Sequence, residues 1–163
     1  MIKKVTVNDI KECVNVICAS FLTVADDLGF THENAPRFTA FATTAERLTY
    51  QLDVEHRPMY AYCEGDKIIG YYSLAPQENH ACELNNLCVL PEYRHRRIGE
   101  KLLNDAYEKA QALGCIKMNI GIVEENVTLR NWYEKMGFQH TGTRKYDFFP
   151  FTCGYMEKII QPS

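Results

Sequence analysis

The amino-acid sequence predicts an α/β fold, in which helices flank a mixed and mostly antiparallel sheet. Two observations carry this prediction. Residues 80–90 and 116–122 have the composition of strands, and a segment of helical periodicity separates them, which is the order of a right-handed βαβ crossover. Residues 59–74 and 139–159 each contain two short strand-like runs, which is typical of antiparallel pairs.

The chain has 163 residues, of which 46% are hydrophobic and 24% charged, a balance typical of one globular domain. No linker, low-complexity tract or repeat divides it, so we expect a single domain over residues 1–163. The apolar runs are far shorter than the ~20 residues that cross a bilayer, and the N-terminus lacks a secretory signal. These features predict a cytoplasmic protein with no membrane partner.

The N-terminal part of the chain predicts one short strand and two helices. We expect a strand at residues 2–5, then a helix that starts at a capping-box-like sequence over residues 6–9. Its apolar side chains recur at helical spacing, at Ile10, Val14, Ile17 and Phe21. We expect this helix to end near Phe21–Leu22, followed by a loop over 25–35 and a second helix over 36–52.

Two hairpins are expected on either side of the βαβ unit. Residues 59–64 and 67–74 are predicted strands joined by Gly65-Asp66, a two-residue turn signal in inverted order. Residues 139–147 and 151–159 are predicted to form a terminal antiparallel pair. These four strands account for the antiparallel part of the sheet.

The strand at residues 80–90 shows an irregular alternation. Cys82 shares a face with Leu84, whereas Leu87 lies an odd number of residues further on. One extra residue at Asn85–Asn86 would restore the alternation, so we expect a β-bulge there.

The helix and strand of the βαβ unit have clear boundaries in the sequence. An apolar stripe follows helical spacing, at Ile98, Leu102, Ala106, Ala110 and Leu113. Gly114 stands where a C-cap is expected, and residues 116–122 alternate as a strand. A further short helix is expected over residues 126–136, ending at Gly137.

Seven cysteines leave one unpaired in any disulfide framework, and none belongs to a C-x-x-C pair. Free cysteine behaves as a small buried hydrophobic residue. We therefore expect reduced thiols in the core and no metal site.

One basic run stands out in a chain of net charge −3, Arg94-His95-Arg96-Arg97. The overall acidity disfavours nucleic acid as a partner. The run lies between a strand end and the first turn of a helix, where free backbone N–H groups favour an anion such as pyrophosphate. Gly99 would let the backbone approach that anion closely. A solvated cationic turn is the alternative interpretation. No nucleoside-triphosphate or dinucleotide motif is present.

The sequence Val89-x-Pro91-x-Tyr93-Arg94-x-x-Arg97-x-Gly99-x-x-Leu102-Leu103 resembles the cofactor loop of the GNAT superfamily of N-acetyltransferases, usually Q/R-x-x-G-x-G/A. Arg97 replaces the first glycine, so either a Cβ is tolerated there or Arg97 itself contacts a phosphate. The resemblance implies that the loop binds the cofactor through Arg94, His95, Arg96, Arg97, Ile98, Gly99 and Glu100.

A second motif, Asn126-x-x-x-x-x-x-Tyr133-Glu134-Lys135-x-Gly137-Phe138, is similar to the same family's N-x-x-A-x-x-x-Y-E-K-x-G-F signature, with Leu129 replacing alanine. The resemblance implies a GNAT-like fold in which acetyl-CoA lies between the splayed ends of parallel strands 82–90 and 115–122. Asn126 would contact the pantetheine arm, act as a helix N-cap, or do both. The backbone groups implied on the first strand are those of Leu87, Cys88 and Val89.

The resemblance also assigns catalytic roles. Tyr133 takes the position of the family's general acid, which protonates the departing thiolate. Glu83 aligns with a strand position that serves as base in some members, acting through water; a solvent-facing residue is its alternative, and His80 or a water chain are the other candidates. Direct attack in a ternary complex is expected, because no cysteine has a recognisable histidine partner.

The expected acceptor is a primary amine of a small molecule or peptide, bound by segments that carry little motif. These are residues 22–36, the strand ends near Tyr71, Tyr72 and Gln77–His80, and the aromatic run 146–151. Acidic residues in the first segment favour a cationic amine or are simply solvated. A catalytically silent acyl-CoA-binding regulator of the same fold is the competing function. The resemblance also leaves room for a homodimer.

Overall fold

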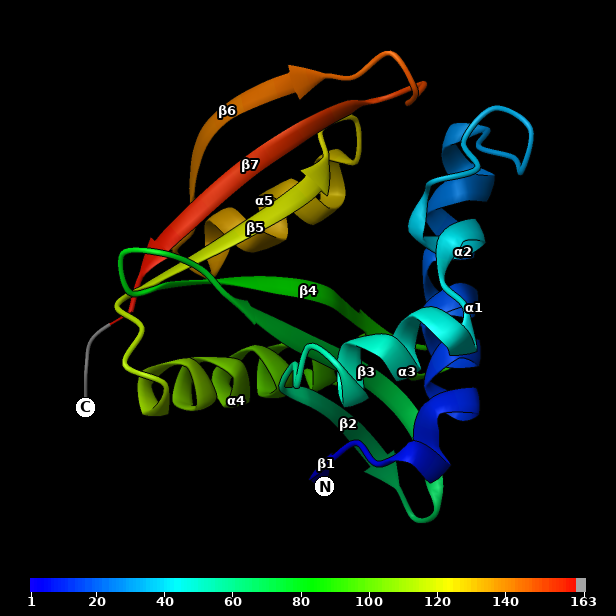
Figure 1. Ribbon diagram of the computed structural model, residues 1–163. Helices are drawn as coiled ribbons and strands as arrows, with labels where there is room; N and C mark the ends of the chain where they lie inside the picture. Colours follow the sequence, from blue (N-terminus) through cyan, green and yellow to red (C-terminus); the bar gives the residue numbers. More distant parts are fainter. Residues whose placement is uncertain (161–163) are drawn as a thin grey trace.

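A seven-stranded mixed sheet in the order β1-β2-β3-β4-β5-β7-β6 organises the protein, whose computed structural model describes residues 1–160 (Figure 1). The strands are β1 (Ile2–Lys4), β2 (Met59–Glu64), β3 (Lys67–Pro76), β4 (Ala81–Val89), β5 (Lys117–Val123), β6 (Gln139–Lys145) and β7 (Thr152–Ile159). The α-helices are α1 (Ile10–Leu28), α2 (Thr39–Ala42), α3 (Ala45–Asp53), α4 (Ile98–Ala112) and α5 (Val127–Lys135). Two single 3-10 turns precede α1 and α4, η1 (Val7–Asp9) and η2 (Pro91–Tyr93).

The parallel strands β4 and β5 part after a short stretch of pairing. Their register begins at Ala81 opposite Lys117 and ends at Glu83 opposite Asn119. Beyond this point β4 stays with β3, and β5 stays with β7. Figure 1 shows β5 and β7 diverging from β4. The mixed sheet with two splayed parallel strands is therefore confirmed.

The predicted bulge lies where β4 faces β3. Tyr71 pairs with Cys88 and Ser73 pairs with Asn85, so one residue of β3 opposes two residues of β4. Asn86 adopts a positive φ of 56° at this point. A bulge bends the strand that carries it, and this one lies just before Leu87, Cys88 and Val89.

Helices α1 and α4 cover opposite faces of the sheet. Successive side chains of a strand point to opposite faces. From β3, the Tyr72 hydroxyl donates to Asp105 Oδ2 of α4 at 2.5 Å, whereas Tyr71 faces Cys13 of α1. The largest fully buried side chains outside β3's two tyrosines are Ile17, Leu48, Met59, Ile68, Ile69, Leu74, Leu102, Leu103, Met118 and Met156. The sheet is thus the middle layer between two apolar helix faces.

The first helix is longer than predicted. The expected end near Phe21–Leu22 and the expected loop over residues 25–35 are wrong for residues 25–28, which belong to α1. Ala25 is fully buried, so the inward stripe continues one more turn, and the helix ends at Gly29 with a left-handed φ of 75°. Gly29 is the residue that signals the end of the helix in the sequence. The polar residues before it interrupt the apolar pattern, so the last turn was not predicted.

The predicted second helix over residues 36–52 is two helices. Residues up to Phe38 are not helical, and Thr43 adopts an extended conformation that separates α2 from α3. The Thr44 side chain then caps α3 by accepting from the Arg47 backbone N–H at 3.1 Å. A capping side chain competes with continued helix at such positions.

The termini of α4 and α5 match the sequence signals. Gly114 and Gly137 both have positive φ after the helix ends. Leu113 is an exception within the predicted stripe, because it is 51% exposed and the buried face of α4 ends at Ala110. Within residues 1–160, no helix is both long and apolar enough to cross a membrane.

All seven cysteines carry free thiols. Five are buried, and Cys18 and Cys153 are half-buried. In the described part of the chain, no three histidine, cysteine or acidic side chains gather in a group that could hold a metal ion.

Candidate active site

The loop between β4 and α4 has an unusual backbone. His95 and Arg97 adopt positive φ values of 65° and 59°, and Arg94 between η2 and His95 is extended. Successive N–H groups in a loop with left-handed residues can form a concavity that binds anions. The first helical bond of α4 runs from the Lys101 N–H to the Arg97 carbonyl. The N–H groups of residues 98–100 therefore have no acceptor within the helix.

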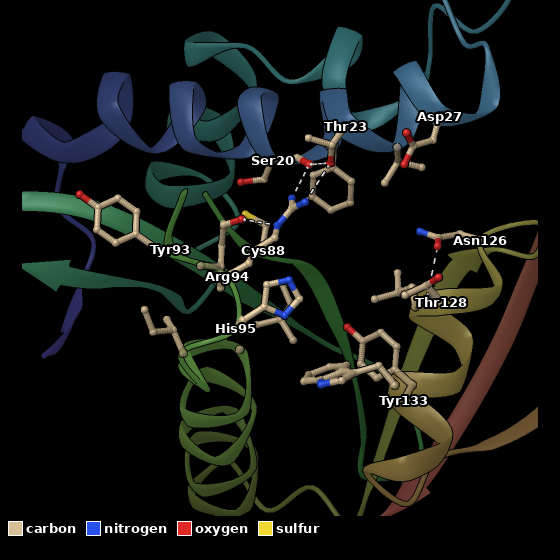
Figure 2. Close-up of a pocket in the computed structure, with 18 of the residues that line it drawn as sticks. Ser20, Thr23, Asp27, Cys88, Tyr93, Arg94, His95, Asn126, Thr128 and Tyr133 are labelled. Atoms are coloured by element: carbon tan, nitrogen blue, oxygen red, sulfur yellow. Dashed lines mark hydrogen bonds between the residues drawn. The ribbon is translucent and has the colours of Figure 1, made fainter. Parts of the chain in front are cut away.

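A cavity of about 860 Å³ opens beside this loop. Figure 2 shows it between α1, the start of α4 and α5. It is lined by side chains from α1, including Ser20, Thr23 and Asp27, and by the loop and α5. The predicted site residues among its lining are Leu87, Cys88, Val89, Arg94, His95, Arg97, Ile98, Gly99, Glu100, Asn126 and Tyr133.

Arg94 lines the cavity but directs its hydrogen bonds into the protein. Its Nη2 donates to the Ser20 carbonyl at 2.9 Å, its Nη1 to Thr23 Oγ1 at 3.1 Å, and its Nε to the Val89 carbonyl at 3.2 Å (Figure 2). The guanidinium thus ties the basic loop to α1. Its structural role is to hold the cavity wall in place.

Arg96 lies outside the cavity. Its guanidinium lies over the Tyr93 ring at 5.2 Å, and its Nη1 is 3.9 Å from Glu64 Oε2. Of the seven loop residues singled out from the sequence, the structure brings the other six to the cavity.

The backbone explains the replacement of a glycine by Arg97. Glycine adopts a φ of about +60° without strain, and Arg97 adopts φ 59° and ψ 19° as the residue before α4. A Cβ is therefore accommodated at this position in a conformation costly for a non-glycine residue. At Gly99 an added Cβ would lie 3.6 Å from Trp132 Cζ2, an ordinary contact, so packing does not demand glycine there.

Tyr133 of α5 lines the cavity. Its side chain is buried between Trp132 and Phe138, with ring centroids 4.9 and 5.3 Å away. Figure 2 shows its hydroxyl pointing into the space between α1 and α4. Burial raises the pKa of Tyr133 well above its ordinary value of 10.0. The hydroxyl is therefore protonated and available as a donor.

Asn126 begins α5 and caps it. Its Oδ1 accepts from the Leu129 backbone N–H at 3.3 Å. The residue also lines the cavity, so the capping role and a contact with a bound molecule are compatible.

A second, smaller cavity of about 220 Å³ adjoins the first. The two share the lining residues Phe21, Val24, Leu87, Asn126, Leu129 and Tyr133. Glu83 lines only the smaller cavity, at the point where β4 and β5 part. Tyr133 is thus a wall residue that the two cavities have in common.

Glu83 is half-buried and held by neighbouring amides. Gln77 Nε2 donates to its Oε2 at 3.2 Å, and Gln77 in turn accepts from Asn119 Nδ2 at 2.9 Å. With the Asn85 amide oriented to satisfy both of its groups, its nitrogen donates to Glu83 Oε1 at 2.6 Å and its oxygen accepts from Arg57. Burial raises the pKa of Glu83 above 4.5, against opposing effects of Arg57 and Gln77. A raised pKa makes the carboxylate a stronger base.

The sequence profile of the Acetyltransferase (GNAT) family matches residues 27–138, more than half of the chain. The chain belongs to the GNAT family. The uncharacterized N-acetyltransferase YvbK of Bacillus subtilis (strain 168) is 29% identical over 96 residues, which span 59% of this chain and 61% of YvbK. The match therefore covers less than two thirds of that relative.

Solved GNAT structures share the fold. The PaiA N-acetyltransferase of Thermoplasma acidophilum, in complex with coenzyme A, has a TM-score of 0.84 at 20% identity and covers 98% of both chains. The ribosomal-protein-S18-alanine N-acetyltransferase of Escherichia coli has a TM-score of 0.74 at 14% identity, over 100% of this chain and 95% of that one. The likeness extends from β1 to β7, well beyond the two motifs.

Two of the residues expected near the acceptor are excluded from this GNAT site. Tyr71 and Tyr72 are fully buried, so neither can contact an acceptor. Successive side chains of β3 point to opposite faces of the sheet, and helices cover both faces. The sequence pattern does not distinguish such a strand from one that has an exposed face. His80, the second candidate base, is exposed in the turn before β4 and lines neither cavity.

The other two acceptor segments converge. Phe30, from the segment 22–36, and Phe38, just beyond that segment, pack against Phe151 with ring centroids 4.9 and 5.8 Å away. Phe149 stacks on Phe151 at 4.5 Å. This aromatic cluster forms one wall of the smaller cavity through Phe38, Phe149 and Phe151.

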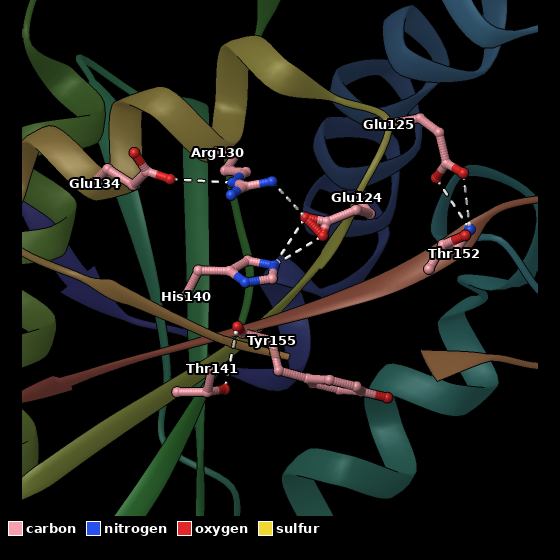
Figure 3. A network of polar contacts seen from close by, with 8 residues as sticks. All are labelled: Glu124, Glu125, Arg130, Glu134, His140, Thr141, Thr152 and Tyr155. Carbon is pink, nitrogen blue, oxygen red and sulfur yellow. Dashed lines mark hydrogen bonds and ion pairs between the residues drawn. The ribbon is translucent and has the colours of Figure 1, made fainter. Parts of the chain in front are cut away.

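A polar network behind α5 was not anticipated from the sequence (Figure 3). Glu124, directly after β5, accepts from Arg130 Nη1 at 2.9 Å and lies 2.8 Å from His140 Nε2. Arg130 also donates to Glu134 at 3.0 Å.

Glu125 accepts from the Thr152 backbone N–H. These contacts fix the turn that carries Asn126 to the cavity. The partners of these contacts lie 4 to 27 residues apart in sequence, with no motif to link them.

Proposed function

We propose that this protein transfers an acetyl group from acetyl-CoA to a primary amine of a small molecule or peptide. The observation that carries the proposal is the meeting of two cavities at Tyr133, one beside the basic loop and one beside Glu83. We also propose that residues 1–163 form a single N-acetyltransferase domain. Free thiols accord with a reaction in the cytoplasm.

The residues present suit acetyl-CoA, which supplies the acetyl thioester. The unpaired N–H groups at residues 98–100 and the Arg97 side chain would hold its pyrophosphate, since anions bind at helix N-termini. Asn126 would contact the pantetheine arm. Backbone groups of Leu87, Cys88 and Val89, downstream of the bulge, would orient the arm and donate to the thioester carbonyl.

Two side chains would move protons during direct attack. As the amine nitrogen bonds to the carbonyl carbon and the carbon–sulfur bond breaks, Glu83 would accept the amine proton through water. Tyr133 would donate its hydroxyl proton to the departing thiolate. Glu83 lines the smaller cavity and Tyr133 lines both, which supports this division of roles.

The thiol environments favour direct attack over an acetyl-cysteine route. Cys88 is the cysteine that lines the larger cavity, and burial raises its pKa to about 12. Thiolate is the nucleophilic form, so this thiol is a poor nucleophile at neutral pH. Initial rates with both substrates varied should give intersecting rather than parallel lines.

Coenzyme A binding and turnover together test the proposed function. A ligand at 100 times its Kd stabilises a folded protein by ~2.7 kcal/mol, so coenzyme A should raise Tm by several degrees. Acetyl-CoA is then mixed with amino acids, peptides, polyamines or aminoglycosides, and the release of free coenzyme A is measured. Stabilisation without release by any amine would instead identify a silent acyl-CoA-binding regulator, and no stabilisation would reject both functions.

Substitutions of Arg97 separate its charge from its backbone strain. Arg97→Ala and Arg97→Gly both remove the charge, and each should weaken coenzyme A binding about tenfold, as expected for a charge-assisted contact of ~1.5 kcal/mol. Only glycine relieves the left-handed strain, so Arg97→Gly should be more stable than Arg97→Ala by ~1 kcal/mol. Calorimetry and denaturant unfolding measure the two effects. Wild-type affinity in both variants would show that Arg97 makes no phosphate contact.

A further inference from the structure

The charges of the smaller cavity carry an inference about the acceptor, and it rests on the proposed function. Among the lining residues of this cavity, only Glu83 and Arg37 are charged. The Glu83 carboxylate is already held by Gln77 and by the Asn85 amide. Arg37, immediately before Phe38, has no acidic partner within residues 1–160. Arg37 therefore brings to the cavity a positive charge that no carboxylate of the described residues pairs with directly.

The guanidinium of Arg37 is positioned by an aromatic ring. It lies 4.3 Å from the centroid of Phe148, in the turn between β6 and β7. Phe148 contacts Phe149 at 4.7 Å between ring centroids, and Phe149 lines the cavity. A stacked guanidinium keeps its N–H edge free to bind a carboxylate in a bidentate manner.

The remaining walls are largely apolar. Phe38, Phe149 and Phe151 form one side, and Ile120 and Ile122 of β5 form another. At about 220 Å³ the cavity is smaller than the ~300 Å³ at which sites for drug-sized ligands begin. A molecule of one or two amino-acid residues with an apolar side chain matches this space.

We propose that the acceptor is an amino carboxylate with an apolar or aromatic body, such as an amino acid or dipeptide, whose carboxylate binds Arg37. Its amine then faces Glu83 and Tyr133, at the junction with the larger cavity. A polyamine or aminoglycoside would bring a second ammonium toward Arg37, and like charges repel. The amine and the carboxylate of such an acceptor would thus each meet one of the two charged residues that line the cavity.

Paired substrates that differ only in the carboxylate test this inference. The probes are L-phenylalanine and glycyl-L-phenylalanine, each against its C-terminal amide, with spermidine as the polyamine. Rates of coenzyme A release are compared per concentration of unprotonated amine, because the amide lowers the pKa of the amine. At least one acid should exceed its amide about tenfold in kcat/KM. Amides that equal or exceed both acids, or a preference for spermidine, would overturn the inference.

Variants assign the preference to Arg37. Arg37→Gln should lower kcat/KM for the preferred acid about five- to tenfold and leave its amide unchanged, because an exposed guanidinium is partly screened by water. Arg144→Gln is the matched control, since Arg144 also lies over an aromatic ring, that of Tyr146 at 4.6 Å, but does not line the cavity. It should behave as wild type. An unchanged acid preference in Arg37→Gln would remove Arg37 from the assignment.

A binding measurement separates this inference from the proposed function. With coenzyme A present, N-acetyl-L-phenylalanine or N-acetylglycyl-L-phenylalanine should bind by calorimetry more tightly than its amide. Amines that release coenzyme A without any preference for acids would overturn the acceptor class alone. No release with any amine in the full screen would overturn the proposed function and this inference with it.

Discussion

Tyr133→Phe is expected to lower kcat by about 10²- to 10⁴-fold, the range for loss of a positioned general acid. The substitution removes one oxygen from a buried ring that packs between Trp132 and Phe138, so the apolar contacts remain. KM for acetyl-CoA should change little, because the hydroxyl acts on the departing thiolate rather than on the bound cosubstrate.

The pH dependence gives Tyr133 a second signature. Burial raises the pKa of its hydroxyl above 10.0, and the acid form is the active one. Activity that depends on this proton is therefore retained up to and beyond pH ~10. The wild-type kcat profile should show no descending limb from Tyr133 below that pH.

Tyr107→Phe is the matched control for this tyrosine. Tyr107 is a half-buried tyrosine of α4 that lines neither cavity, and its pKa is also raised by burial. It should retain wild-type kcat. A folded Tyr133→Phe enzyme with unchanged kcat would contradict the proposed acid role.

Glu83→Gln is expected to lower kcat/KM by about 10²-fold at neutral pH, the lower range for general base catalysis. Glutamine preserves the shape and can still bond to Gln77 and Asn85, but it cannot take a proton. The loss should appear with every amine that the enzyme accepts, because each must give up a proton before or during attack.

The sign of the pH effect follows from the direction of the pKa shift. Burial raises the pKa of Glu83 above 4.5, and the carboxylate is the active form. The wild-type rate should therefore fall as pH drops through this raised pKa, while the variant has no carboxylate to lose. The ratio of wild-type to variant rates should approach one at acidic pH.

Glu78→Gln controls for the loss of a negative charge near the strand. Glu78 is exposed in the preceding turn and lines neither cavity. It should leave both the rate and the profile unchanged. A rate ratio for Glu83→Gln that stays constant with pH would transfer the role of base to a water chain.

Much of the fold was predictable because its signals are local. Gly114 and Gly137 end helices by adopting positive φ, and the slip at Asn85–Asn86 shows in three or four neighbouring residues. The wrong boundaries have a different cause. Thr43 interrupts α2 and α3 although the surrounding residues favour a helix, and a side-chain cap by Thr44 decides the outcome. Helix propensity summed over a window of residues does not detect a single capping contact of this kind.

The basic run shows the same limit within the site. Four adjacent residues look equivalent as sequence, but Arg94 binds α1, Arg96 lies over Tyr93, and Arg97 faces the cavity. Their directions depend on the left-handed conformations at His95 and Arg97 and on a helix more than 70 residues away. The spacing of residues in the sequence does not predict these side-chain directions.

The sequence by itself determined the family and the strand–loop–helix unit. The basic loop with Gly99 and the Asn126–Phe138 signature are short-range patterns, so both can be read from neighbouring residues. Only the tertiary structure decided that Arg94 holds the wall of the cavity, that Tyr71 and Tyr72 lie in the core, and which charge faces the smaller cavity. Those features come from contacts between segments distant in the chain, such as the turn between β6 and β7 against the residues before α2. Local pattern sets the elements, and long-range packing sets what their side chains face.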